Sequence, residues 1–280
     1  MRKILAFIIS CILVFTLTAC NTTFIFGKGN ELNLNGYDLV FFDDFNGDSL
    51  DTSRWEYRSV GPVRVHGATL NEIKTKAYCN HPKQVSVKDG CLAITGEYTT
   101  SEYGESWHSA SIRLKDFYTY GYFEIKCIPN NSADFWSAFW LQSGNSYNHD
   151  ISQGGRYGAE IDIFETYKNH DLTTKGFITS TIHCNGFDEI PDKVDSKRVV
   201  KAYVNNLYSD YTTFGLMWTE TEYIFYVNGI ESGRSSFANG TSCVPEEVIV
   251  SLCAPDNIKL DKSTTTRFRV DSVKIYQISK

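Results

Sequence analysis

The chain has 280 residues, of which 42% are hydrophobic and 21% charged, so it is long enough for one large domain with a sizeable core or for two small ones. Its formal net charge of −6 argues against nucleic acid as a partner. The same acidic balance mildly disfavours strongly sulfated polymers as a substrate.

The N-terminal residues 1–19 predict an export signal that is not part of the fold. Arg2 and Lys3 form a short basic start, and residues 4–17 form an almost unbroken apolar run. This run is too short to span a bilayer comfortably and is typical of the hydrophobic region of a signal peptide. It ends in Leu17-Thr18-Ala19-Cys20, which resembles the bacterial lipoprotein box.

The resemblance implies cleavage before Cys20 and attachment of a lipid to its sulfur. The alternative is an uncleaved anchor helix, and in both cases we expect the body of the protein on the outer face of a bacterial membrane. Residues 20–36 have little periodicity, and we expect them to form a flexible tether behind the lipidated cysteine. Residues 37–280 contain no linker that would divide them, so we expect one domain there.

From Tyr37 onward the sequence predicts short strands and turns, with no convincing helix and no internal repeat. Two hairpins are predicted, around Lys88-Asp89-Gly90 and around Asn228-Gly229. Many short strands at this spacing indicate an all-β sandwich or barrel. The expected strands cover residues 39–45, 85–87, 91–95, 109–114, 118–128, 135–142, 158–165, 177–183, 211–218, 223–227, 230–233, 247–253 and 268–276.

Of the eight cysteines, Cys11 belongs to the signal and Cys20 is the expected lipid site. The remaining six show no metal-type spacing such as C-x-x-C. An exported protein could pair them, but a domain of this size does not need disulfides, and several lie in apolar strand patterns. We therefore favour buried free thiols for Cys79, Cys91, Cys127, Cys184, Cys243 and Cys253.

The strand predicted at 135–142 carries large apolar groups on both faces. Alternation places Trp136, Ala138, Trp140 and Gln142 on one face, and Phe135, Ser137, Phe139 and Leu141 on the other. One face must pack in the core. The face with two tryptophans either packs under other protein or contacts a ligand, and indole rings stack well on the C–H faces of sugars.

The strand 160–165 gathers three carboxylates. Glu160 and Asp162 point the same way, but strict alternation would place Phe164 and not Glu165 beside them. One extra residue, a β-bulge between 162 and 165, would return Glu165 to the acidic face and leave Ile161 and Ile163 in the core.

Three neighbouring carboxylates repel one another, and at least one should hold a proton near neutral pH. Two carboxyl groups that differ in acidity are what glycoside hydrolysis requires, one to attack the anomeric carbon and one to protonate the leaving oxygen. The alternative is a solvated acidic strand, which the spacing alone does not exclude.

Together these segments resemble glycoside hydrolase family 16, the laminarinase and lichenase group. Glu160-Ile-Asp-Ile-Phe-Glu165 is similar to the bulged form of the family's E-x-D-x-x-E signature. Similar family segments occur, in chain order, at 42–47, 50–55, 120–124, 136–141, 211–218, 226–229 and 270–277. The resemblance implies a jelly roll of two antiparallel sheets with a concave substrate groove, and endo-hydrolysis of a β-linked polysaccharide with retention.

The resemblance also implies individual roles. Glu160 matches the nucleophile, Asp162 the assisting acid and Glu165 the acid/base. Five residues match positions that line the sugar subsites: Trp136, Trp140, Arg113, Asn71 and His183. By sequence alone, Arg113 is an ordinary strand residue, Asn71 is a loop residue and His183 lies at the end of a strand.

Two departures from the family pattern bear on the surroundings of the site. Tyr122 stands where the family often has Arg, and Met217 where Glu often precedes the Trp. No cofactor is required by this chemistry. Some family members bind calcium near the first and last strands, and Asp44 and Asp271 are the candidate ligands, although Asp44 replaces a more usual Glu.

The leading interpretation is an endo-β-1,3-glucanase, with mixed 1,3-1,4 linkages as a further substrate, acting as a monomer. Three alternatives stay open. The same chemistry could act on a β-galactan such as agarose or carrageenan, the enzyme could be a transglycosylase, or the protein could be a non-catalytic glycan-binding lipoprotein. The loops at 60–80 and 143–157 would decide the substrate, and spacing does not reveal their chemistry.

Overall fold

The computed structural model describes residues 22–63, 78–132, 134–143, 155–166, 176–184, 195–237, 240–254 and 258–280. These residues form β-strands and short 3-10 segments, among them η1 (Pro82–Gln84) and residues 155–157. No helix among the described residues is long and apolar enough to cross a membrane. Most strand pairings are antiparallel, as expected for a jelly roll.

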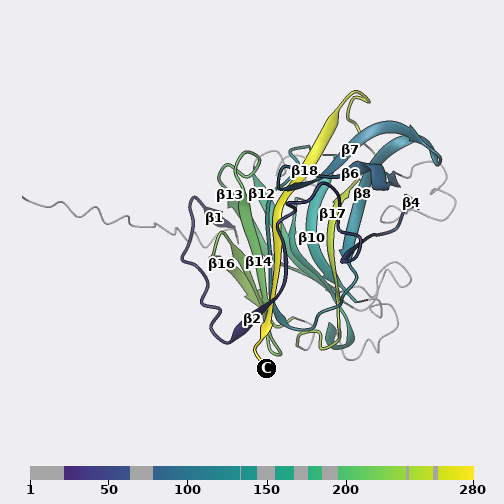
Figure 1. Ribbon diagram of the computed structural model, residues 1–280. Helices are drawn as coiled ribbons and strands as arrows, with labels where there is room; N and C mark the ends of the chain where they lie inside the picture. The colour runs from purple at the N-terminus through teal and green to yellow at the C-terminus, as the bar shows by residue number, and fades with distance from the viewer. Residues whose placement is uncertain are drawn as a thin grey trace, which may run out of the picture.

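The strands form two packed sheets, which we name sheet A and sheet B (Figure 1). The order in sheet A is β3 (Trp55–Tyr57), β8 (Gly104–Leu114), β17 (Glu247–Cys253), β10 (Trp136–Gln142), β11 (Glu160–Glu165), β12 (Phe177–Cys184), β13 (Asp195–Val204) and β1 (Thr23–Ile25). Strand β1 is parallel to β13.

Sheet B is centred on the long strand β18. Its order is β16 (Ile230–Ser235), β15 (Tyr223–Val227), β14 (Thr212–Trp218), β9 (Gly121–Ile128), β18 (Thr265–Ile278) and β2 (Tyr37–Asp43). The first half of β18 pairs with β7 (Cys91–Ser101), which pairs in turn with β6 (Val85–Lys88). The short strand β5 (Cys79–Asn80) pairs with the middle of β8, and β4 (Gly61–Pro62) pairs with β5.

The core lies between the sheets and is rich in aromatic side chains. Phe164 of β11 stacks on Phe214 of β14, with ring centroids 4.1 Å apart and an interplanar angle of 19°. Phe268 of β18 meets the same Phe164 ring edge-on at 6.0 Å. All three rings are fully buried. These contacts tie the carboxylate strand directly to the opposite sheet.

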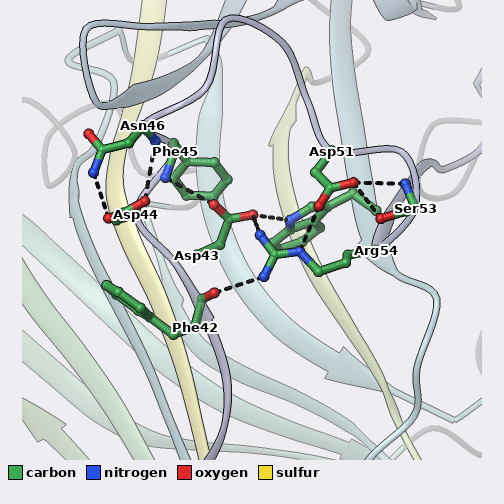
Figure 2. A network of polar contacts seen from close by, with 9 residues as sticks. Phe42, Asp43, Asp44, Phe45, Asn46, Asp51, Ser53 and Arg54 are labelled. Carbon is green, nitrogen blue, oxygen red and sulfur yellow. Dashed lines mark hydrogen bonds and ion pairs between the residues drawn. The ribbon is translucent and has the colours of Figure 1, made fainter.

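A polar network joins the end of β2 to the start of β3 (Figure 2). The carboxylate of Asp43 is buried and accepts hydrogen bonds from Trp55 Nε1 at 2.8 Å and from the Arg54 guanidinium at 2.7 Å. Arg54 also donates to Asp51 at 2.9 Å. Because β2 belongs to sheet B and β3 to sheet A, this network fixes how the chain crosses between the sheets.

The all-β expectation is confirmed, and both expected hairpins are present. The sequence pattern did not predict β13, β3 or the short strands β1, β4 and β5. The expectation of a flexible tether was wrong for its described part. Thr23–Ile25 pairs with Ala202–Val204, Ile25 is buried, and Gly29 N–H donates to Asn228 O at 2.8 Å.

Candidate active site

The predicted bulge lies in β11. Asp162 is opposite Trp140 and Phe164 is opposite Phe139 in β10, so Ile163 is the extra residue. On the other side, Asp162 faces Thr181 and Glu165 faces Thr179 in β12. The bulge therefore turns Glu165 onto the face that carries Glu160 and Asp162. We call this the site face of sheet A.

The bulge also explains what lies behind the three acids. Ile161, Ile163 and Phe164 are all buried in the core, as expected for the two isoleucines. Asp162 is buried with 3% of its surface exposed, whereas Glu160 and Glu165 are half-buried. The two glutamates are therefore more accessible to a bound substrate than the aspartate between them.

Burial and mutual repulsion make the carboxylates hold protons more tightly than usual. Burial raises the pKa of Glu160 to about 8, with further contributions from the charges of Asp162 and Glu165. Burial also raises the pKa of Asp162 to about 7, while a hydrogen bond with Glu165 opposes that rise. Both directions agree with the expectation that the group holds a proton near neutral pH. We expected Glu160 to be ionised before substrate binds, as a nucleophile must be. Its raised pKa instead favours the protonated form in the free protein.

Three residues that carry no signal in the sequence form a hydrogen-bonded chain behind Glu160: Gln142, Arg58 and Glu247. Gln142 Nε2 donates to Glu160 Oε2 at 2.6 Å, and the Gln142 carbonyl accepts from the Arg58 guanidinium at 2.6 Å. Arg58 in turn pairs with Glu247 at 3.1 Å. Because arginine can only donate, it fixes the orientation of the Gln142 amide so that its NH₂ group faces Glu160.

Both predicted tryptophans lie on the site face. In β10, Trp136 and Trp140 are half-buried, whereas Phe139 and Leu141 are fully buried on the core side, so the predicted alternation is confirmed. Trp140 Nε1 donates to Ser251 Oγ at 3.1 Å. The Arg58 guanidinium lies 4.9 Å from the centroid of the Trp140 ring.

His183 is joined to the acidic group. It is opposite Glu160 in the β11–β12 pairing, and its Nε2 lies 3.2 Å from Asp162 Oδ2. Its Nδ1 is 2.6 Å from Ser196 Oγ of β13. Glu160, Asp162 and His183 have ligand atoms within 4.8 Å of one another, so they are the described residues that could hold a metal ion.

Arg113 lies on the site face two strands from β10 and is engaged by two carboxylates. It pairs with Glu247 at 2.5 Å and with Glu56 of β3. Glu247 thus bridges Arg58 and Arg113 and neutralises much of their charge. Asn71 and Cys20 lie outside the described residues.

The two departures from the family pattern lie far from the site. Tyr122 of β9 and Met217 of β14 are directly opposite each other in sheet B. Their neighbours Phe123 and Leu216 point into the core, so this pair points away from sheet A. The expectation that these substitutions change the surroundings of the site was wrong.

The proposed calcium ligands do not converge. Asp44 accepts hydrogen bonds from the backbone and side chain of Asn46 at 3.3 and 2.5 Å (Figure 2). Asp271 pairs with Lys126 at 3.0 Å. Among the described residues, neither belongs to a group of His, Cys, Asp and Glu close enough to hold a metal ion. The structure therefore gives no support to the expected calcium site.

A two-sheet jelly roll with three carboxylates on one bulged central strand defines a glycoside hydrolase. A family model described as the GH16 domain of β-porphyranases A–D matches residues 40–249. The chain belongs to glycoside hydrolase family 16.

Curated relatives are 25–31% identical over the regions that match. The glucan endo-1,3-β-glucosidase A1 of Niallia circulans is 25% identical over 214 residues, which are 72% of this chain and 30% of that protein. The β-porphyranase D of Zobellia galactanivorans is 26% identical over 155 residues, which are 52% of this chain and 33% of that protein. The matched region thus spans about a third of each relative.

Solved structures share the fold at lower identity. A single-residue variant of LamA from Z. galactanivorans, in complex with laminaritriose and laminaritetraose, superposes with a TM-score of 0.66 at 19% identity, covering 85% of this chain and 98% of that one. A structure from work on endo-acting O-glycanases of the human gut microbiota has a TM-score of 0.68 at 19% identity, covering 88% and 92%. These similarities establish the fold.

Proposed function

We propose that this protein is a retaining endo-glycosidase that hydrolyses internal β-1,3 linkages of a glucan, including mixed β-1,3-1,4 linkages. The observation that carries the proposal is the bulge in β11, which brings Glu160, Asp162 and Glu165 onto one face with the glutamates half-exposed. Retaining enzymes hold their two carboxyl groups about 5–5.5 Å apart, and residues on one short strand segment suit that separation.

In this mechanism Glu160 attacks the anomeric carbon and Glu165 donates a proton to the leaving oxygen. A hydrogen bond joins the carboxyl groups of Asp162 and Glu165, and such a bond forms only while one of the two carries a proton. The Gln142 amide and the positive charge of Arg58 favour the ionised form of Glu160. Once the sugar esterifies Glu160, one negative charge disappears, so Glu165 can act as the base toward water.

Removal of each glutamate tests these roles. Glu160→Gln and Glu165→Gln are each expected to abolish nearly all activity of the full chain. Azide should rescue only a small replacement such as Glu160→Ala or Glu160→Gly, because it can then attack the anomeric carbon directly. Full activity in either glutamine variant would disprove the assignment.

A second candidate substrate is a β-galactan. It is favoured by the match of residues 40–249 to the β-porphyranase family model, and the relatives include both glucanases and a β-porphyranase. Reducing-end release from laminarin, mixed-linkage β-glucan, agarose and carrageenan, with Glu160→Gln as the blank, distinguishes the substrates. Release from only a galactan would keep the mechanism and replace the glucan.

The same assay tests the other interpretations. A folded protein that binds one polymer without cleaving it would be a glycan-binding protein, and products longer than the starting chains would indicate transglycosylation. We further propose that Cys20 carries a lipid that holds the protein on the outer face of a bacterial membrane. Mass spectrometry of the mature N-terminus would show the lipid, and an intact Met1 would contradict it.

A further inference from the structure

An exposed aromatic cluster covers one edge of sheet A, at β1. Phe24 and Phe26 are 42% and 67% exposed, and their rings stack with centroids 6.3 Å apart. Tyr203 of β13 contacts both rings, at 5.9 and 5.8 Å, and Phe177 of β12 lies 5.5 Å from Tyr203. We call Phe24, Phe26, Tyr203 and Phe177 the aromatic edge.

The aromatic edge is held in place by the backbone of β1. Thr23–Ile25 pairs in register with Ala202–Val204, and Asn205 N–H donates to Ile25 O at 2.9 Å. Thr23 Oγ1 donates to Ser232 O at 3.4 Å. Large apolar rings that stay exposed on a firmly paired edge strand are typical of a surface that meets a ligand.

The sequence that precedes β1 identifies that ligand. Only residues 21 and 22 lie between Cys20 and Thr23, a span of about 10 Å when the chain is extended. This inference rests on the lipid proposed for Cys20, which would hold the aromatic edge next to the membrane. A flexible tether would allow the domain to move away from the membrane. Because β1 is paired with β13, the chain beyond Thr23 cannot act as such a tether.

We propose that the aromatic edge lies in the headgroup region of a phospholipid bilayer and fixes the orientation of the domain on the membrane. Aromatic side chains favour this interfacial region, and a second contact strengthens an anchor that a single acyl chain provides only reversibly.

A basic residue lies beside the aromatic edge, although the whole chain is acidic: the Lys201 ammonium is 5.6 Å from the centroid of the Phe177 ring. A cation at this position favours anionic headgroups. Since β13 and β12 separate β1 from β11, the carboxylates would lie about 14 Å along the sheet from the membrane contact.

Tryptophan reporters in the full chain test this contact without requiring catalysis. Phe24→Trp and Phe26→Trp each place an indole in the aromatic edge, and Phe42→Trp places one at a similarly exposed position of β2 in sheet B. Each variant is bound to vesicles of phosphatidylethanolamine and phosphatidylglycerol that contain a brominated phospholipid. The added fluorescence of the first two is expected to be largely quenched, and that of Phe42→Trp to persist.

Other results would overturn the proposal. Equal quenching at all three positions would mean that the edge has no preferred contact with lipid. A change in the Phe26→Trp emission on adding laminarin without vesicles would assign the edge to polysaccharide, and a change on concentrating the protein alone would assign it to a second copy. Loss of hydrolysis in any assay would bear on the proposed enzymatic function and not on the membrane contact of the aromatic edge.

Discussion

The side-chain amide of Gln142 donates to Oε2 of Glu160 at 2.6 Å, while its carbonyl is held by Arg58 at the same distance. A buried carboxylate with a raised pKa is a poor nucleophile while it is protonated. An N–H donor stabilises the ionised form, and its strength depends on being aimed correctly. Arg58 therefore acts through Gln142, as a positioning residue for the proposed nucleophile.

We predict that Gln142→Leu lowers kcat/KM by about tenfold to a hundredfold, because a hydrogen bond to a charged group is worth about 1.5–3 kcal/mol. It should also move the acid limb of the pH profile to higher pH, since Glu160 loses a donor that favours its ionised form. Arg58→Gln should produce a smaller shift in the same direction. The pH dependence of kcat/KM measures both effects.

The matched control is Gln277→Leu, because Gln277 donates to Thr119 O at 3.2 Å near the end of sheet B. This control should leave the pH profile unchanged. An unchanged profile in Gln142→Leu as well would show that the amide has no influence on the proton of Glu160.

We predict the opposite pH shift for Asp162→Asn. The charge of Asp162 raises the pKa of Glu160, so its removal should lower that pKa and move the acid limb to lower pH. The maximum rate should fall, because the ordered contact of Asp162 with Glu165 and His183 is altered. The control is Asp271→Asn, which removes one negative charge on sheet B and should leave the acid limb of the pH profile in place. A shift of the acid limb to higher pH in Asp162→Asn would contradict this prediction.

Glu246 is predicted to make stability fall as pH rises. It is fully buried, it accepts from Ser242 Oγ at 2.6 Å and from Ala159 N–H at 3.2 Å, and burial raises its pKa from 4.5 to about 8. A raised pKa means that the folded chain binds the proton more tightly than the unfolded chain. The stabilisation is complete below the ordinary pKa and is lost as pH rises toward about 8.

Between pH 5 and pH 8 the free energy of unfolding should therefore fall less in Glu246→Gln than in the wild type. The difference should be on the order of a few kcal/mol. The free energy of unfolding, measured with urea across this range, gives the difference. Comparison with the wild type is necessary because Glu160 and Asp162 contribute slopes of the same sign. The exposed Glu105→Gln serves as the control, and parallel curves for Glu246→Gln and the wild type would refute the prediction.

Phe164→Ala is predicted to lower the free energy of unfolding by about 3–5 kcal/mol, as is typical for removal of a buried phenylalanine. The side chain is fully buried against Phe214 and Phe268, and it holds the bulge of β11 against sheet B. Phe42→Ala, at a ring that is 42% exposed, should change stability by only about 0.5 kcal/mol. Denaturant unfolding of both variants decides the point, and similar small losses would show that the core at the bulge is poorly packed.

Local alternation was sufficient to predict the central strands and the bulge. In β10 alternation separates Trp136 and Trp140 from Phe139 and Leu141, and in β11 the acids can share a face only if one residue is extra. Strand β13 escaped prediction because a bulge opposite Ser180 and Thr181 breaks its alternation at Val199 and Val200. Strand β8 was found only in part, because its first residues, Gly104–Trp107, are exposed or half-buried and show no apolar alternation.

The support of Glu160 was not predictable from the sequence. Arg58 is 84 residues from Gln142 and 189 from Glu247, and none of the three carries a local signal. Gln142 was placed on the correct face by alternation, but its partner could be identified only once β10 and β11 were paired. Long-range pairing of polar groups depends on the whole fold, and a single sequence does not record it.

The pairing of β1 with β13 also determines where the chain can be shortened. Sheet edges carry unpaired N–H and C=O groups that recruit strands from other molecules. In the intact chain β1 covers this edge over Ala202–Val204. A chain beginning at Glu31 would lack β1 and leave β13 open along that row, so it should aggregate more readily than one beginning at Asn21.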